Sequence, residues 1–264
     1  MRRLTIALCV TACLAAGCAT GPQPPPYPAF VQADALPDQF MATLPGIRAR
    51  QFSGNAETGT SGSRIDLPPD WRGTTGGMPG RSLELFVLAG TLSLADIELG
   101  PGGYAYVPPG SIGFNLATDR GARVLWFVDE VDPAAVIRTP IVLDSELVDW
   151  VPAGAAGTWE RELRSDPGSG ARTRLLRVEP GAVLPFEAST EREEGFLVSG
   201  EFRQVECVAG EPYVDTYTPG GYFNRPPGAV HGGQAAAALK ESVWLLREAR
   251  AGRRAAAAGC PPPD

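Results

Sequence analysis

Residues 220–231 read GGYFNRPPGAVH, and this stretch decides the fold. Its frame is Gly220, then Pro226 six positions later, which begins a Pro-x-Gly turn, and then His231, three positions after the glycine of that turn. The same frame occurs at residues 102–113, GGYAYVPPGSIG, which lie 118 residues earlier (220 minus 102) and have glycine in place of the histidine. Because a Pro-x-Gly turn ends one strand and orients the next, the frame indicates β-structure.

Two further pairs of segments repeat at nearly the same spacing. Residues 52–59 match residues 163–170 at an offset of 111, and residues 85–90 match residues 195–200 at an offset of 110. One insertion of about eight residues after residue 200 accounts for the step to 118. An ordered series of matches at a near-constant offset predicts two copies of one fold.

The pattern inside each copy is that of β-strands. Short runs rich in Val, Leu, Phe, Tyr and Thr are separated by clusters of Gly, Pro, Asp and Ser, and no helical period persists over a long window. We therefore predict an all-β protein with little helix. Residues 83–88 are apolar on both faces, which predicts that one barrel packs against the other.

The repeated frame resembles the second signature of the cupin superfamily, and the chain resembles uncharacterised bacterial two-cupin families and the cupin of anti-sigma factors. The resemblance covers roughly residues 45–250. It implies two tandem jelly-roll barrels, with a degenerate barrel 1 at residues 30–142 and barrel 2 at residues 143–250. Cupins include dioxygenases, isomerases, seed storage proteins and small-molecule binders, so the resemblance implies a fold far more than an activity.

The first cupin signature resembles HxHx(3–4)Ex6G, and Glu193 followed by Gly200 fits its acidic end. The two histidine positions then fall on Glu187 and Ser189, or on Phe186 and Ala188 if the spacer is one residue longer. The histidine position of the second signature is His231, the one histidine of the chain.

The resemblance implies that any metal site consists of His231, Glu193 and Glu187. An oxygen-rich set of this kind would suit Mn²⁺ or Zn²⁺, whereas the two histidines and one carboxylate usual for redox iron cannot be assembled. For one ion to reach all three side chains, their donor atoms must converge within about 4–5 Å.

Strand alternation means that Glu193 and Glu194 cannot both face the barrel interior. The family frame places Glu193 inside, and Glu194, with its charged neighbours, on a solvated face. By the same register Glu84, which aligns with Glu194, should point out of barrel 1 as a paired or solvated carboxylate. We therefore expect barrel 1 to be structural.

The first eighteen residues resemble a bacterial lipoprotein signal. Two arginines precede a run of thirteen uncharged, mostly apolar residues, which is too short to span a bilayer. Residues 14–18, LAAGC, resemble a lipobox, so we expect a signal peptide at residues 1–17 and lipidation of Cys18, with Cys13 as a second candidate. A plain secretory signal is the alternative. Residues 18–29 then form a lipidated, Pro-rich tether, and residues 251–264 a tail.

Charge and cysteine content narrow the function. The net charge is −7, and −9 without residues 1–17, which argues against nucleic acid as a partner. Cys207 and Cys260 lie outside the signal and form no zinc pattern, which makes a structural zinc site unlikely by sequence. A periplasmic or extracellular location would permit a disulfide between them, which would pin the tail to barrel 2.

Two functions fit these observations. The preferred one is a non-catalytic bicupin lipoprotein, anchored in the cell envelope through its lipidated N-terminus, that binds a small ligand or a partner protein. The alternative is a metal-dependent enzyme of dioxygenase or isomerase type, with Mn, Zn or Fe in barrel 2. The sequence carries no signal for an oligomeric state.

Overall fold

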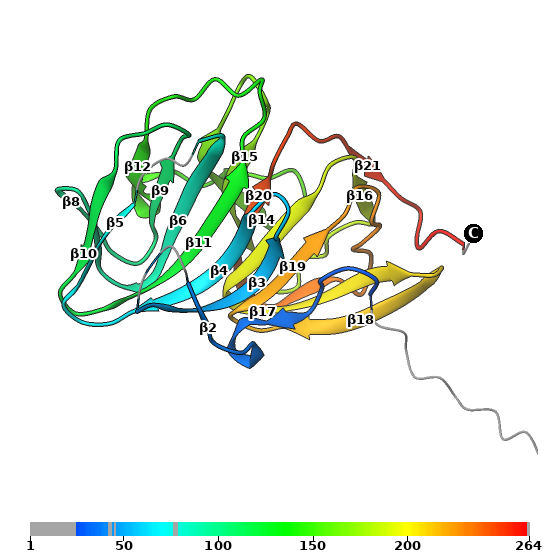
Figure 1. Cartoon of the computed structure of the whole chain (residues 1–264). Coiled ribbons are helices and arrows are strands. Elements are labelled where there is room, and N and C mark those ends of the chain that lie inside the picture. Colours follow the sequence, from blue (N-terminus) through cyan, green and yellow to red (C-terminus); the bar gives the residue numbers. More distant parts are fainter. Residues whose placement is uncertain (1–24, 42–43, 45, 76–78, 263–264) are drawn as a thin grey trace, which may run out of the picture.

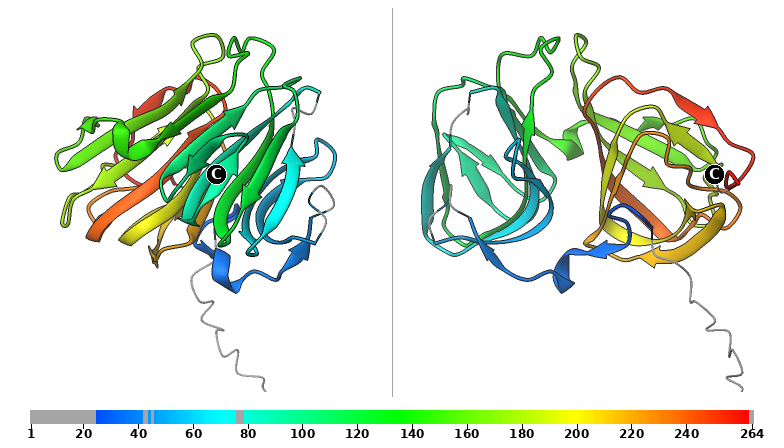
Figure 2. Two further views of the ribbon diagram at one scale, coloured as in Figure 1. Left: turned by 90° about the vertical axis from the view of Figure 1, so that its left-hand side faces the viewer. Right: turned by 45° about the vertical axis from the view of Figure 1, so that its right-hand side comes forward.

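The computed structural model describes residues 25–41, 44, 46–75 and 79–262, which form two antiparallel β-barrels lying side by side (Figure 1, Figure 2). Helix is confined in these ranges to two 3₁₀ turns, η1 (Ala33–Ala35) and η2 (Ser145–Leu147). The prediction of an all-β protein with two tandem jelly rolls is confirmed. Within the described ranges, no helix has the length and apolar character needed to cross a membrane.

Barrel 1 consists of a seven-stranded and a four-stranded sheet. In spatial order, the larger sheet contains β12 (Ile141–Asp144), β9 (Gly103–Val107), β6 (Arg81–Gly90), β11 (Ala122–Glu130), β4 (Thr60–Leu67), β3 (Arg48–Asn55) and β2 (Gln39–Phe40). The smaller sheet contains β5 (Trp71–Thr75), β10 (Phe114–Thr118), β7 (Leu92–Leu94) and β8 (Ile97–Leu99).

Barrel 2 repeats this plan. Its main sheet contains, in order, β1 (Val31–Gln32), β19 (Gly221–Arg225), β17 (Glu193–Val208), β20 (Ala237–Glu248), β15 (Arg172–Val178), β14 (Thr158–Ser165) and β13 (Val151–Pro152). The distal half of β17 also pairs with β18 (Glu211–Tyr217), and a separate two-stranded ribbon joins β16 (Glu187–Ser189) to β21 (Arg254–Ala256).

The repeated sequence segments occupy equivalent places in the two barrels. Gly90 and Gly200, which end the matching segments, both have positive φ, +74° and +94°. A Cβ atom on either would lie about 2 Å from the carbonyl oxygen of a neighbouring strand, at Gly121 and Glu241 respectively. Close backbone approach therefore requires glycine at both positions, which explains why the repeat keeps it.

The two copies exchange their first strands. β1, from the start of copy one, pairs with β19 of barrel 2, while β12 pairs with β9 of barrel 1. Equivalent hydrogen bonds follow each strand, from Ala33 N to Gly220 O (3.0 Å) and from Ser145 N to Gly102 O (3.1 Å). The boundary expected between residues 142 and 143 thus falls inside β12, a strand of barrel 1, and β1 belongs to the sheet of barrel 2.

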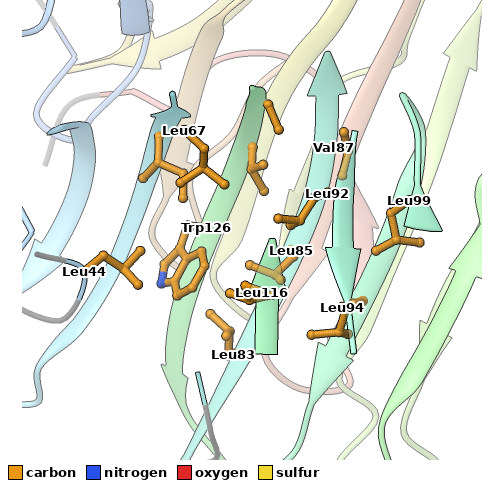
Figure 3. Close-up of a cluster of buried hydrophobic side chains, with 14 of the residues drawn as sticks. Leu44, Leu67, Leu83, Leu85, Val87, Leu92, Leu94, Leu99, Leu116 and Trp126 are labelled. Carbon is orange, nitrogen blue, oxygen red and sulfur yellow. The ribbon is translucent and has the colours of Figure 1, made fainter. Parts of the chain in front are cut away.

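Both faces of β6 are buried, as its sequence predicts. Leu83, Leu85 and Val87 point into barrel 1, whose interior is filled by leucines and Trp126 (Figure 3). Glu84 and Phe86 point outward into a second cluster, shared by the two large sheets. This cluster contains Phe52, Tyr104, Leu125 and Phe127 of barrel 1 and Leu163, Leu175, Phe196, Tyr222 and Leu245 of barrel 2.

Glu84 points out of barrel 1, as expected, and is buried between the barrels, where Tyr104 and Thr173 donate hydrogen bonds to it. Glu194 was expected on a solvated face, and this prediction is wrong, because Glu194 is buried in the same interface. Tyr222 donates to Glu194 at 2.5 Å, just as Tyr104 donates to Glu84 at 2.5 Å. The two carboxylates are therefore equivalent groups of a pseudo-symmetric interface.

Candidate functional site

The interior of barrel 2 holds a cavity of about 600 Å³. Its polar lining consists of Glu160, Arg172, Arg174, Glu187, Glu193, Gln204, Arg225, His231, Glu248 and Arg254. Its main apolar lining consists of Leu176, Leu184, Pro185, Phe202, Phe223, Trp244 and Leu246. Barrel 1 differs, since its interior is packed with leucine side chains.

Strand register separates the polar end of this cavity from the apolar end. Glu193 pairs with Arg225 on one side and with Glu248 on the other, so these charges lie in one row across the sheet. Two residues further along the same strands, Phe223 and Leu246 flank Gly195. The cavity is therefore amphipathic, with charged groups at one end and aromatic and aliphatic groups at the other.

His231 follows the Pro-Pro-Gly turn that the sequence singles out. Its backbone exchanges hydrogen bonds with Glu187 of β16, at 2.9 and 3.0 Å, and its side chain is 7% exposed. Burial and the nearby Arg225 lower the pKa of His231 well below its usual value, so the ring is neutral. Nδ1 lies 3.1 Å from the carbonyl oxygen of Ala229, which can only accept, so Nδ1 carries the proton and Nε2 an unshared electron pair.

The three predicted site residues converge. His231 Nε2 lies 3.7 Å from Glu187 Oε1 and 3.7 Å from Glu193 Oε2, within the separation that a shared ion would need. Glu193 faces the cavity and Glu194 faces away, as strand alternation predicts. Burial raises the pKa of the Glu193 carboxyl. Ser189, the other candidate position, instead accepts a hydrogen bond from the backbone of Glu191.

Arg254 is the site residue that sequence reasoning missed. Residues 251–264 were expected to be a tail, yet β21 pairs with β16 at the entrance of barrel 2 (Figure 1). Arg254 contacts Glu187 Oε1 at 2.5 Å and Glu248 Oε1 at 3.0 Å, and it also pairs with Glu193. Burial opposes its charge, but Glu193, Glu187 and Glu248 together raise the pKa of Arg254. The one sequence signal for this arrangement is Cys260.

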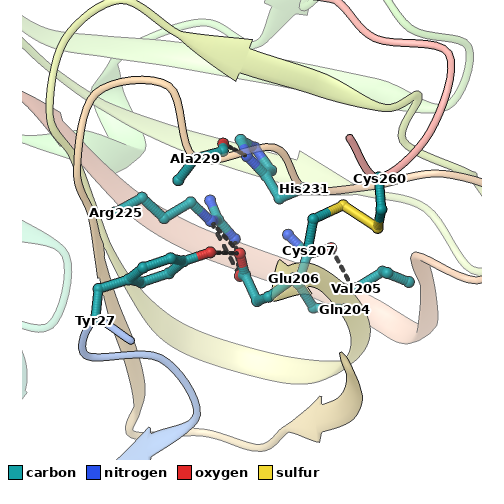
Figure 4. The surroundings of a disulfide bond; sticks show 9 residues. All are labelled: Tyr27, Gln204, Val205, Glu206, Cys207, Arg225, Ala229, His231 and Cys260. Atoms are coloured by element: carbon teal, nitrogen blue, oxygen red, sulfur yellow. Dashed lines mark hydrogen bonds and ion pairs between the residues drawn. A yellow bond between two sulfur atoms is a disulfide. The ribbon is translucent and has the colours of Figure 1, made fainter. Parts of the chain in front are cut away.

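The Cys207–Cys260 disulfide considered from the sequence is present, with a Cα–Cα distance of 5.1 Å (Figure 4). It joins the distal half of β17 to the end of the chain and so holds residues 249–260, the C-terminal strap, across barrel 2. The strap adds a cavity-lining arginine that comes from outside the predicted barrel.

A second polar group lies next to the disulfide (Figure 4). Glu206 is fully buried and binds Arg225 through three contacts of 2.7–3.1 Å. Tyr27 donates a hydrogen bond of 2.8 Å to the same carboxylate, and Phe30 stacks on Tyr217. Residues 18–29 were expected to be a tether. From Tyr27 onward, however, this segment packs on barrel 2. Cys18 lies outside the described residues.

The donor set does not fit a metal ion in this arrangement. Glu187 and Glu193 already bind the guanidinium of Arg254, which takes the position that a cation between them would need. In the described part of the chain, no group of three or more His, Cys, Asp or Glu residues is arranged to hold a metal. The convergence expected from the sequence is therefore present, but an internal organic cation satisfies it.

Residues 138–249 match the family model described as the ChrR cupin-like domain. No curated protein matches the chain by sequence. A candidate dioxygenase from Nostoc punctiforme has a similar structure, with a TM-score of 0.69 and 19% identity over 86% of each chain. The E. coli protein Ylba has a TM-score of 0.67 and 15% identity over 83% of this chain and 89% of its own.

Oxalate decarboxylase from Bacillus subtilis, an enzyme with Mn(II) centres, is also similar. Its TM-score is 0.59, with 12% identity over 86% of this chain and 78% of its own. At such identities, these three structures establish the fold of the chain rather than its chemistry.

Proposed function

We propose that this chain, whose two barrels have the cupin fold, is a non-catalytic protein of the bacterial cell envelope that binds a small molecule inside barrel 2. The observation that carries the proposal is the cavity of about 600 Å³, polar at one end and apolar at the other. A volume of this size suits a small organic ligand, and a largely apolar wall with a few polar groups is the usual composition of such sites.

The competing function is a metal-dependent enzyme of dioxygenase or isomerase type. It is favoured by the convergence of His231, Glu187 and Glu193, and by the Mn(II) centres of the structurally similar oxalate decarboxylase. Against it stands Arg254, because a divalent ion close to this guanidinium would meet strong repulsion.

Native mass spectrometry and metal analysis of the purified mature protein test the two functions together. We expect a copurified or added small molecule to shift the mass and the melting temperature, with less than about 0.1 metal ion per chain, in keeping with a donor set that is already paired. Stoichiometric Mn, Zn or Fe that is lost in His231→Ala would refute the non-catalytic function. The matched control is Glu211→Ala, an exposed residue outside the cavity.

A further inference from the structure

We propose that Arg254 is a built-in competitor in barrel 2, occupying a site for the guanidinium or amine group of a cationic ligand that enters when the C-terminal strap lifts. This inference rests on the ligand-binding function proposed above. It names the chemical class of the ligand and the segment of the chain that regulates its access.

The first support is the set of acceptors around Arg254, which contacts Glu187 and Glu193, while His231 lies 3.7 Å from both carboxylates. Glu187 and Glu193 present carboxylates, and His231 presents the unprotonated Nε2. The ring proton of His231, on Nδ1, is directed at Ala229 and away from the two carboxylates. Nε2 has no hydrogen bond among the described residues, although the side chain is buried, with 7% of its surface exposed. Three acceptors directed at one point require a donor-rich group, and guanidinium and ammonium groups are the donor-rich groups of organic molecules.

The second support is the charge of the barrel wall. Without Arg254, the cavity lining holds four glutamates at positions 160, 187, 193 and 248 and three arginines at positions 172, 174 and 225. All three arginines have other partners: Arg225 binds Glu206 behind the lining, Arg174 binds Glu160 and Glu248, and Arg172 binds Glu160 and Glu162. Lifting the strap therefore leaves Glu187 and Glu193 without a cation, and a positively charged ligand restores the balance that Arg254 supplies.

The third support is the remainder of the cavity, which favours an organic cation over a bare ion. Phe223 and Trp244 line the apolar end, beyond the row of charges. A cavity of about 600 Å³ leaves room for a hydrocarbon chain behind the cationic group. Arg254 itself has this chemistry, since a guanidinium is attached to an aliphatic stem.

The strap is held in a way that allows competition. β21 contributes only three residues to its pairing with β16, and the Arg254 side chain is 34% exposed. The Cys207–Cys260 disulfide fixes the far end of the strap six residues beyond Arg254. Tethering at both ends raises the effective concentration of the guanidinium at the site, so breaking the disulfide weakens the competitor without removing it.

Calorimetric titration with agmatine and putrescine tests the inference. We expect weak binding to the wild-type chain and at least about tenfold tighter binding to Arg254→Ala, because the internal competitor is gone. Cys207→Ser/Cys260→Ser should tighten binding by a smaller factor. Arg253→Ala is the matched control. Arg253 is the exposed neighbour of Arg254 on the strap, and its backbone binds Thr190 rather than the three acceptors, so this variant should bind the ligands as the wild type does. Glu193→Gln added to Arg254→Ala should reverse the gain.

A rescue experiment covers the case in which Arg254→Ala folds poorly. Ethylguanidine at millimolar concentration should raise the melting temperature of Arg254→Ala by several degrees more than that of Arg253→Ala, since it replaces the missing group. If neither amine nor guanidine compound binds or rescues Arg254→Ala, the inference is wrong. Zinc or manganese binding to Arg254→Ala in place of these cations would also overturn it.

The same variants separate failure of this inference from failure of the proposed function. A neutral or anionic molecule that binds in barrel 2 of the wild type, with no response to cations in Arg254→Ala, would refute the ligand class and leave the binding function standing. If no molecule of any class shifts the melting temperature of either protein, the binding function itself fails.

Discussion

Asp166 and Asn55 hold equivalent positions in the two copies, and each closes a tight turn. Asn55 Oδ1 accepts hydrogen bonds from the backbone of Glu57 and Thr58, while Asp166 Oδ1 accepts from Gly168 and Ser169. Asp166 also accepts from the amides of Val136 and Ile137, in the connection between β11 and β12 of barrel 1. One copy thus uses an amide for a local turn, and the other uses a carboxylate that also holds this connection of barrel 1.

Asp166→Asn should destabilise the protein mainly at neutral pH. Burial works against the charge, but four backbone N–H groups lower the pKa of Asp166 from 3.8 to about 2. Because the folded pKa lies below the unfolded one, the stabilisation is present above about pH 4 and is lost as pH falls through 2. It amounts to about 2 kcal/mol. Urea denaturation at pH values from about 2 to about 7 measures the difference in the free energy of unfolding between the variant and the wild type.

The control for this prediction is Asp119→Asn, since Asp119 is an exposed partner of Arg72, with its side chain 78% exposed. Its loss should change the free energy of unfolding by less than about 1 kcal/mol. Equal stability of Asp166→Asn and the wild type at neutral pH would show that the backbone amides do not discriminate between a carboxylate and an amide.

β17 connects the two functional parts of barrel 2. Its first half carries Glu193 toward the cavity and Glu194 toward barrel 1, and its second half carries Glu206 and Cys207. The two ends of the described chain both meet this second half, since Tyr27 binds Glu206 and Cys260 binds Cys207. A single long strand therefore couples the cavity, the inter-barrel interface and both chain ends.

Cys207→Ser/Cys260→Ser should loosen the strap first and the barrel second. The disulfide closes a loop with a sequence separation of 53, for which chain entropy predicts up to about 4 kcal/mol of stabilisation. Hydrogen exchange should accelerate at residues 254–257, whose pairing with β16 is short. Unchanged protection of these amides in the variant and in reduced wild-type protein would show that β21 stays docked without the bond.

The two barrels are joined by a buried ionic group at their pseudo-symmetric interface. Arg247 of barrel 2 binds Glu84, Asp129 and Glu194, and its guanidinium lies 3.9 Å above the ring of Phe127. Arg247 pairs with Glu194 on the neighbouring strand of barrel 2, and at the equivalent place in barrel 1 Phe127 pairs with Glu84. Burial works against ionisation of Glu84, but Arg247, Arg164 and two hydroxyl donors lower its pKa to about 2. The symmetry of the interface is thus broken where one cation serves both copies.

Arg247→Met should destabilise the whole molecule by about 3–5 kcal/mol, because it leaves two buried carboxylates without their shared cation. Thermal and urea unfolding measure this loss. Arg192→Met is the control, since the Arg192 side chain is 41% exposed and its contacts with the same group are 3.6 and 3.8 Å. If Arg247→Met is as stable as Arg192→Met, the ionic group does not hold the barrels together.

The membrane attachment expected from the first eighteen residues is a prediction about the whole chain. The proposed anchor predicts that Cys18→Ser moves the protein from the membrane fraction to the soluble fraction, or blocks its processing, because stable attachment needs the acyl chains. Fractionation with metabolic palmitate labelling measures this. Cys13→Ser should behave as the wild type does, and the reverse result would assign the anchor to Cys13.

The sequence by itself determined the two-barrel fold and three of the residues that meet in barrel 2. The first inference rests on segments that repeat at offsets of 110–118 residues, and the second on the resemblance of their turn residues and glycines to the cupin signatures. The spacing of Gly200 after Glu193, and of His231 after Gly228, matches the cupin signatures, and that resemblance implied that both side chains face the inside of the barrel. Alternation along β17 was enough to direct Glu194 away from Glu193, although not to say that it would be buried.

Only the tertiary structure decided what those residues bind. Arg254 lies 67 residues from Glu187, and Tyr27 lies 179 residues from Glu206, so no local pattern relates the members of either pair. The sequences around Arg254 and Tyr27 are rich in Ala, Arg and Pro and read as a tail and a tether. Both segments dock on barrel 2, where Arg254 binds Glu187 and Glu193 and Tyr27 binds Glu206. The identity of the cation at the site was set by that docking, because Arg254 reaches the carboxylates from outside the barrel.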